Sequence, residues 1–250
     1  MEQRLMRYLK LTLSYDGSNY NGFQRQNNAI GVQQIVEKAL SILLGEDIKV
    51  AASGRTDTGV HARGQVISFG TVSTVPTINI PKAIRHLLPR DIVVYGAKEV
   101  DSEFNARYSA IEKTYQYKIV IADIPDPFIR NYAWEINKDL DLKAMQQAAD
   151  FLVGTHDFSA FRNQGSKPMV PVRTIKKAKW SSNGNELKFT ITGDGFLYRM
   201  VRNIVGALVK VGSGKMTTEE FQTIMLSKDR KRCGVAAPAR GLYLHSVRYK

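Results

Sequence analysis

The residues best suited to chemistry are concentrated in one short segment, Ser53–Ala62. A carboxylate, Asp57, and a guanidinium, Arg55, stand there between two glycines, Gly54 and Gly59. Because glycine permits positive φ and a close approach of the backbone to a ligand, this spacing predicts that Asp57 is presented on an exposed loop. Taken alone, the residue types also fit an ordinary turn in which Asp57 bonds its own backbone and Arg55 is solvated.

Residues that bind metals are sparse. The chain has one cysteine, Cys233, and its four histidines are widely separated, at His61, His86, His156 and His245. Zinc sites usually combine close pairs of these residue types. We therefore predict no metal site built from Cys or His, and we interpret His61 as a hydrogen-bonding residue that fixes its loop rather than as a general base.

The first half of the chain contains the elements that must position this loop. Leu9, Leu11 and Leu13 alternate with polar residues and predict a strand that ends at a turn beginning with Asp16. Apolar residues at helical spacing predict a helix from Val32, and Gly45 is suited to its C-terminal cap. Further strands are predicted at 48–52, 64–69 and 92–100, and a short helix at 81–88.

The second half shows a similar order of elements, which predicts an α+β protein of two similar halves, residues 1–105 and residues 106–250. The predicted elements of the second half are strands at 115–121, 174–180, 187–192 and 242–249 and helices at 140–152 and 200–211. Residues 161–173 combine polar residues, glycine and proline and are typical of a long loop over a site.

The charge of the chain indicates a polyanionic partner. Its 36 lysines and arginines exceed its 23 aspartates and glutamates, giving a formal net charge of +13. Such a surplus attracts nucleic acid. The polar N-terminal residues do not fit a signal peptide, and no apolar run approaches the roughly 18 residues that span a bilayer. We expect a cytoplasmic protein without a membrane partner.

Six sequence blocks together resemble the TruA family of tRNA pseudouridine synthases. The first is GRTDTGVHARGQV at 54–66, which is similar to the segment that carries the catalytic aspartate in that family. The others are similar to family blocks in the family order and span nearly the whole chain. They are YDGSNYNGFQRQ at 15–26, FNARYSA with KTYQY between 104 and 117, VGTHDFSAFR at 153–162, GFLYRMVRNIVG at 195–206 and APARGLYL at 237–244.

The resemblance implies roles for four residues. Asp57 would be the catalytic carboxylate, acting on the base or on the sugar, as carboxylates do in glycosidic cleavage. Arg202 would pair with it and keep it ionised, and Arg55 would hold RNA phosphate or help extrude the nucleotide, although these two roles can be exchanged. Tyr115 would stack on the flipped uracil. Because the reaction is an isomerisation that adds and removes nothing, no cofactor is expected.

The family resemblance also implies a fold and partners. Two ferredoxin-like halves would join their antiparallel sheets into one larger sheet with helices on one face and an active-site cleft between the halves. The protein would act as a homodimer on uridines 38–40 of the tRNA anticodon stem-loop. Basic clusters at 173–179 and 228–232 would contact the tRNA backbone.

Two other functions fit parts of the sequence. A non-catalytic RNA-binding protein or tRNA chaperone on the same fold would explain the positive charge and the order of elements. A nucleotide hydrolase would use the glycine-bracketed loop to hold phosphate, but that loop lacks a cluster of carboxylates for a metal ion. We therefore expect an isomerase that acts on tRNA.

Overall fold

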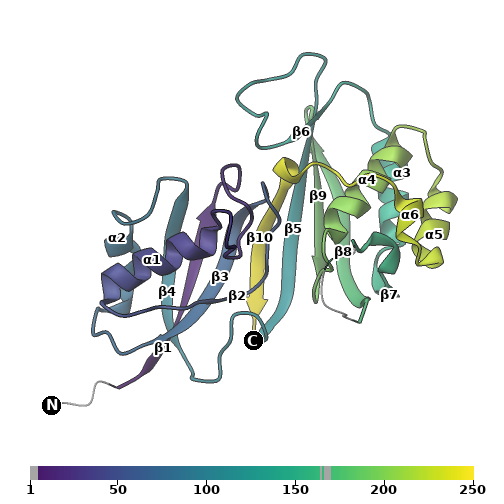
Figure 1. Ribbon diagram of the computed structural model, residues 1–250. Helices are drawn as coiled ribbons and strands as arrows, with labels where there is room; N and C mark the ends of the chain where they lie inside the picture. Colours follow the sequence, from purple (N-terminus) through teal and green to yellow (C-terminus); the bar gives the residue numbers. More distant parts are fainter. Residues whose placement is uncertain (1–4, 164, 166–169) are drawn as a thin grey trace. The chain divides into compact units, whose positions relative to one another are not determined.

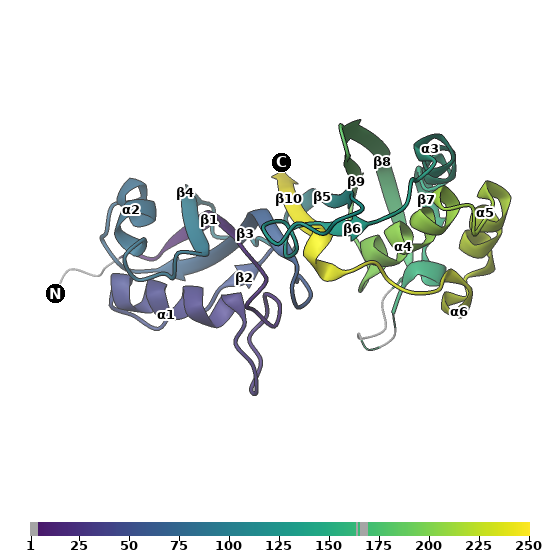
Figure 2. The ribbon, with the colours of Figure 1, turned by 90° about the horizontal axis from the view of Figure 1, so that it is seen from above.

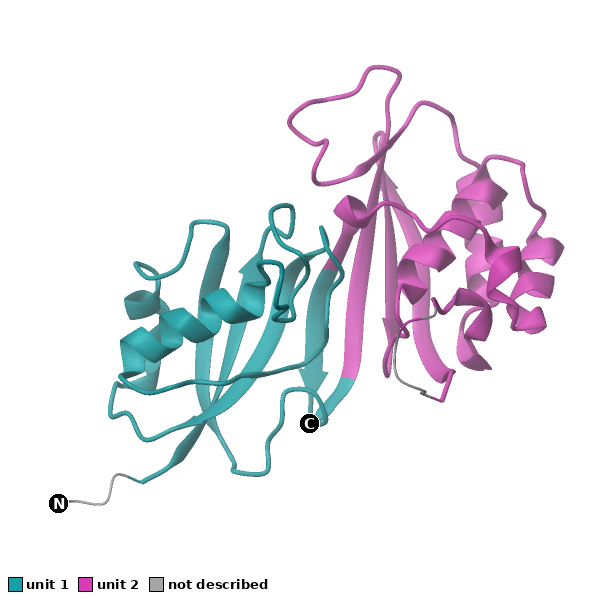
Figure 3. Ribbon diagram, in the orientation of Figure 1, with its two compact units in different colours: residues 1–111, 244–250 teal, residues 112–243 magenta. Residues whose placement is uncertain are grey.

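The chain forms two compact units, one of which includes both ends of the sequence (Figure 3). The computed structural model describes residues 5–163, 165 and 170–250, so part of the loop expected at 161–173 lies outside the described residues. Unit 1 comprises residues 1–111 and 244–250, and unit 2 comprises residues 112–243. The sequence placed the boundary at 105/106 and assigned the C-terminal strand to the second half. That strand instead packs with unit 1, where the Tyr249 hydroxyl donates to the Ala106 carbonyl at 2.8 Å.

Unit 1 has the β-α-β-β-α-β order of a ferredoxin-like fold. Within it, β4, β1, β3 and β10 are successive neighbours, and β2 also pairs with β3. The pairs β1–β3, β1–β4 and β2–β3 are antiparallel. Its elements, shown in Figure 1, are β1 (Arg7–Tyr15), α1 (Val32–Leu44), β2 (Ala51–Ala52), β3 (His61–Thr71), α2 (Ile80–Ile84), β4 (Ile92–Val100) and most of β10 (Leu242–Tyr249).

One face of the unit 1 sheet is covered by α1 (Figures 1 and 2). Leu9, Leu11 and Leu13 of β1 are fully buried on that face, together with Val36 and Leu40 of the helix. The helix ends at Gly45, whose φ of 73° is the left-handed conformation expected of a C-terminal cap.

Unit 2 has a mixed sheet with its helices on one side (Figure 2). The strand order is β5-β9-β8-β7 with antiparallel pairing, and β6 adds a parallel pairing to β5. Its elements are β5 (Ala110–Ile121), β6 (Trp134–Ile136), α3 (Leu142–Asp150), β7 (Gly154–Asp157), β8 (Val172–Asn183), β9 (Glu186–Gly193), α4 (Met200–Gly212), α5 (Thr218–Ser227) and α6 (Arg230–Cys233). The expected combination of helices and multistranded sheet is confirmed.

Some predicted elements differ from the observed ones. The strand predicted at 48–52 is reduced to β2, because side chains replace the ladder bonds: Ser41 Oγ accepts from the Ile48 N–H and Glu37 Oε1 accepts from the Val50 N–H, both at 3.0 Å. The helix predicted at 81–88 ends at Ile84. Among the described residues, no helix is long and apolar enough to cross a membrane.

Candidate active site

The Asp57 loop, residues 53–60, connects β2 to β3 in unit 1. Its first residues are bound to Gln65, which is fully buried on β3. The Ser53 hydroxyl donates to Gln65 Oε1 at 2.6 Å, and Gln65 Nε2 donates to the Gly54 carbonyl at 2.9 Å. Gly59 has a positive φ of 75°, whereas Gly54 does not. Because losing a buried partner costs about 1–3 kcal/mol, these bonds fix the start of the loop on β3.

Thr56 anchors the middle of the Asp57 loop. It is 7% exposed, its Oγ1 lies 2.8 Å from the Tyr15 hydroxyl oxygen, and its carbonyl accepts the Phe23 N–H at 3.1 Å. The carbonyl of Asp57 accepts the Val60 N–H at 3.1 Å, which closes a turn. Asp57 itself is partly exposed. Asp57 therefore lies in a turn whose backbone is held on both sides.

Two glycines allow the segment 15–26 to pack directly against this loop. A Cβ at Gly17 would lie 2.0 Å from the Val60 carbonyl oxygen, and a Cβ at Gly22 would lie 2.5 Å from the Thr56 carbonyl oxygen. Gly22 also has a φ of +83°, which side-chain-bearing residues rarely adopt. Larger residues at these two positions would displace the backbone on either side of Asp57.

His61 joins the same two segments. Its ring is 2% exposed, and Nδ1 lies 3.0 Å from the Gly17 nitrogen and 3.1 Å from Asp16 Oδ1. Nδ1 accepts from the Gly17 N–H in the tautomer that leaves Nδ1 without a proton, and in the other tautomer it can donate to Asp16. The prediction that His61 fixes its loop is confirmed.

Tyr115, on β5 of unit 2, is 8% exposed and packs edge-on against Phe196, with ring centroids 5.1 Å apart and planes at 82°. Phe196 was not among the predicted site residues, although it lies in the block at 195–206. Tyr117, two residues along β5, is fully buried, and its hydroxyl donates to the Pro238 carbonyl at 2.8 Å. Burial raises the pKa of Tyr117 well above its usual range, against the opposing effect of nearby Arg202 and a second arginine, so its hydroxyl remains a donor.

Arg202 lies in the first turn of α4 and is bound to a short segment, residues 234–238. Its Nε donates to the Ala237 carbonyl at 2.8 Å, and its own carbonyl accepts the Ala237 N–H at 2.9 Å. The segment can approach α4 this closely because Gly206 has no side chain: a Cβ there would lie 2.3 Å from the Val235 carbonyl oxygen. These contacts fix the orientation of the Arg202 guanidinium.

A buried polar network surrounds the start of α4. Asn203 is fully buried, and its Nδ2 donates to the Phe161 carbonyl at 2.7 Å and to Asn163 Oδ1 at 2.9 Å. Arg230 donates to Asn203 Oδ1 at 2.8 Å, to Asn163 Oδ1 at 3.0 Å and to the Gly234 carbonyl at 2.8 Å. Sequence periodicity did not reveal this network, which ties α4, α6 and the segment after Phe161 together.

The residue before α4 is strained. Arg199 has a φ of 58°, and such a left-handed conformation costs a non-glycine residue about 1–2 kcal/mol. It is held by its carbonyl, which accepts the Asn203 N–H at 3.0 Å. Next to it, the Tyr198 carbonyl accepts the Asn163 N–H at 3.1 Å. Strain of this kind is typical of functional sites, and here it lies three residues before Arg202.

The two predicted basic clusters are not uniformly solvated. In the cluster at 228–232, Arg230 turns inward to the asparagines, whereas Lys231 and Arg232 are exposed. In the cluster at 173–179, Lys176 pairs with Glu112 at 2.9 Å. Their contact with RNA stays a prediction.

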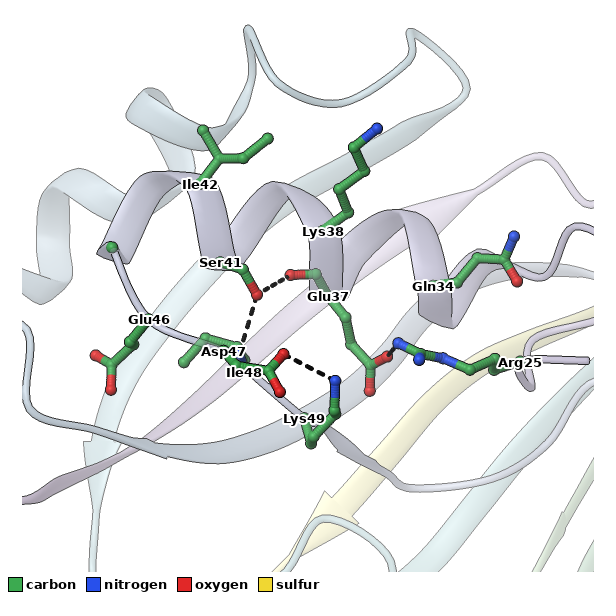
Figure 4. A pocket seen from close by; sticks show the side chains of 11 residues that line it. Arg25, Gln34, Glu37, Lys38, Ser41, Ile42, Glu46, Asp47, Ile48 and Lys49 are labelled. Atoms are coloured by element: carbon green, nitrogen blue, oxygen red, sulfur yellow. Dashed lines mark hydrogen bonds and ion pairs between the residues drawn. The ribbon is translucent and has the colours of Figure 1, made fainter.

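A wide hollow of about 580 Å³ lies beside α1, in a different part of unit 1 from the Asp57 loop (Figure 4). Its lining carries both charge signs, and Glu37 points from α1 toward Arg25, with which it forms an ion pair. Glu37 is 2% exposed and also accepts from Gln33 and from the Val50 N–H, each at 3.0 Å. The carboxylate is therefore fully used in fixing the chain that leads into β2.

The four residues predicted to form the site are divided between the units. Asp57 and the exposed Arg55 belong to unit 1, and Tyr115 and Arg202 belong to unit 2. Within unit 1 the geometry accounts for a fixed and accessible carboxylate, and within unit 2 it accounts for an oriented guanidinium and a packed aromatic ring. Among the described residues, no group of three His, Cys, Asp or Glu is arranged to hold a metal ion.

Comparison with known proteins identifies the family. A family model described as tRNA pseudouridine synthase matches residues 12–109 and 148–250, which include the Asp57 loop and α4. The chain is 46% identical over 244 residues to tRNA pseudouridine synthase A of Clostridium kluyveri, covering 98% of this chain and all of that protein. Identity is also 46% over 244 residues to the enzyme of that name from Acetivibrio thermocellus, with the same coverage. The chain belongs to the tRNA pseudouridine synthase family.

A third relative also matches over nearly the whole chain. The tRNA pseudouridine synthase A of Anoxybacillus flavithermus is 44% identical over 245 residues, covering 98% of this chain and 99% of that protein. The recognition of this family from the sequence blocks is confirmed. Tyr115 lies between the two segments that match the tRNA pseudouridine synthase family model, so the match does not bear on its role.

Proposed function

We propose that this protein converts uridine to pseudouridine at positions 38–40 of the tRNA anticodon stem-loop, with Asp57 as its catalytic carboxylate. Family membership makes it an isomerase that acts on tRNA uridines. The assignment of Asp57 rests on the structure of its loop. The partly exposed Asp57 follows Thr56, which is buried and held by two hydrogen bonds. A rigid turn presents a reactive group at low entropic cost.

The reaction needs one nucleophile and a grip on the base. In the sugar route, an Asp57 oxygen attacks C1′ as the N1–C1′ bond breaks, and the freed uracil keeps the bonding electrons. After the base turns, C5 forms a bond to C1′ and the carboxylate leaves. The proton on C5 is lost and N1 gains one, so the product is an isomer of the substrate. The same carboxylate suits addition to the base, and both routes leave Asp57 unchanged.

Arg202 and Tyr115 supply what Asp57 lacks. A guanidinium beside the carboxylate would stabilise the negative charge of Asp57 in a site that excludes water. The Arg202 Nε bond to Ala237 limits the directions in which that guanidinium can point. Tyr115, which packs against Phe196, offers an aromatic ring on which the flipped uracil can stack. Exposed Arg55 would bind phosphate. The convergence of these residues on Asp57 is part of the proposal.

The proposal extends to the setting in which the enzyme works. Its net charge of +13 supports binding of a long polyanion such as tRNA. We propose that it acts in the cytoplasm, where tRNA is modified, as a homodimer in which one tRNA contacts both subunits.

Mapping pseudouridine at single-nucleotide resolution tests the target. The protein would be incubated with an unmodified tRNA transcript carrying uridine at 38, 39 and 40, and with a matched transcript carrying cytidine there. Pseudouridine confined to positions 38–40 of the first transcript is expected. Pseudouridine only at other positions in both transcripts would overturn the proposed specificity.

A further inference from the structure

The face of the unit 1 sheet opposite α1 carries an unusual set of side chains. On β1, Leu9, Leu11 and Leu13 point into the core, so the alternate residues Lys10 and Thr12 lie on the other face. We call this other face the open face. It carries lysines and aromatic rings, a combination that is typical of sheets that bind single-stranded RNA.

Two lysines of the open face stand directly opposite each other. Lys10 of β1 is the register partner of Lys98 of β4, and the Lys98 side chain is exposed. Like charges at such positions destabilise a sheet. On β3 the register partner of Lys10 is Ser68, and the pairs next to it on the same face are formed by Thr12 with Val66 and with Gly96; none of these residues is acidic. This arrangement costs stability, and among the described residues neither lysine has a carboxylate partner, so it is suited to an anion from another molecule.

The aromatic rings of the open face are fixed in place. Lys10 Nζ lies 5.4 Å from the Phe104 ring centroid and 5.2 Å from that of Tyr249, and the two centroids are 5.0 Å apart. Tyr95 of β4 is 54% exposed, yet its hydroxyl donates to the Arg63 carbonyl of β3 at 2.8 Å. Because β1 lies between β4 and β3, the Tyr95 ring must extend across β1.

A hollow of about 150 Å³ adjoins these rings and is lined by residues of four strands, among them Thr12, Val66, Tyr95 and His245. All of its lining residues belong to unit 1. An exposed aromatic ring whose position is fixed loses little entropy on stacking with a base, and base stacking is tolerant of sequence. The lysines beside it match the phosphates that flank a stacked base.

We propose that the open face is a second tRNA-binding surface, on which an unpaired nucleotide stacks on Tyr95 while Lys10 and Lys98 neutralise its phosphates. The proposal rests on tRNA being the substrate, but it does not depend on Asp57 being the catalytic residue. Its positive charge and fixed rings favour RNA over a protein as the occupant.

Equilibrium binding of the full chain to an unmodified tRNA transcript tests the proposal. Tyr95→Ala should weaken binding by about tenfold, since a stacked base contributes about 1–3 kcal/mol. Tyr95→Phe keeps the ring and loses the hydroxyl bond to the Arg63 carbonyl, so it should bind more tightly than Tyr95→Ala and closer to the wild type. Lys98→Ala should lower the slope of log K against log salt by about one. Lys38→Ala, which removes an exposed lysine from α1 on the opposite side of the same unit, is the control.

Three outcomes would overturn the proposal. Tyr95→Ala binding as tightly as Tyr95→Phe would remove the stacking role, and Lys98→Ala with the same salt dependence as Lys38→Ala would remove the phosphate role. The third outcome concerns the oligomeric state, measured by light scattering. If Tyr95→Ala changed the molecular mass and lost tRNA affinity in parallel, the open face would be assigned to a second copy of this chain. Because the measured quantity is affinity rather than product formation, a failure of Asp57 as catalyst would leave these comparisons unaffected.

Discussion

Replacing Asn203 by alanine should destabilise unit 2 and impair catalysis together. The substitution removes three hydrogen bonds at a fully buried side chain, those to Phe161, Asn163 and Arg230. Each such bond contributes about 1 kcal/mol, and a bond to a charged group about 1.5–3 kcal/mol. We therefore expect the free energy of unfolding to fall by about 3–5 kcal/mol, with allowance for the groups left without partners.

Tryptophan fluorescence during urea unfolding measures this change selectively. The chain has two tryptophans, Trp134 and Trp180, and both lie in unit 2 with Asn203. A loss of 3–5 kcal/mol corresponds to a fall in Tm of roughly 6–20 °C for a chain of this size. Asn183→Ala, at an exposed position of β8, should change stability by less than about 0.5 kcal/mol.

The same variant separates positioning from stability. Because Asn203 is adjacent to Arg202, its loss should lower kcat at temperatures where the variant is fully folded, while the affinity for tRNA changes little. An Asn203→Ala protein that unfolds within about 1 kcal/mol of the wild type would show that the network does not hold the start of α4, and the reasoning would be refuted.

Three further predictions concern the Asp57 loop and the buried thiol. Gly22→Ala should reduce pseudouridine formation by at least tenfold, because its Cβ would lie 2.5 Å from the Thr56 carbonyl oxygen. Gly184 also has a positive φ, but no other atom lies near the position of a Cβ. Gly184→Ala should therefore lose about 1 kcal/mol of stability and keep its activity. Burial raises the pKa of Cys233 to about 11, against nearby cations, so its thiol should react with a disulfide reagent at pH 8 only after unfolding. Between pH 9 and 11 the unfolded state releases this proton first, so stability should fall with pH, and less steeply in Cys233→Ala.

Regular elements with strong periodicity were predictable from the sequence. The apolar spacing from Val32 and the glycine at 45 identified α1 and its cap, and alternation identified β1. The helix α5 was missed, although Thr217 and Glu220 form a capping box that marks its start. The strand predicted at 48–52 was mostly wrong because long-range side-chain bonds, which no local pattern reports, replaced its ladder.

The candidate site was likewise predictable from the sequence only in part. Motif resemblance identified the Asp57 loop, and the residue types around it explained why a glycine-bracketed carboxylate is useful. The fit of Gly17 and Gly22 against that loop depends on two segments that are about 40 residues apart in sequence meeting in the fold. The inward turn of Arg230 could not be predicted either, because a charge cluster in sequence does not reveal which member finds buried acceptors.

The direct test of the central claim is pseudouridine formation by Asp57→Asn on an unmodified tRNA transcript. The substitution keeps the shape of the side chain and removes its charge. We expect no detectable pseudouridine, with tRNA affinity within a few-fold of the wild type. Asp47→Asn, at an exposed position of the same unit, should be as active as the wild type. Full activity of Asp57→Asn would contradict the assignment of this carboxylate as the catalytic group.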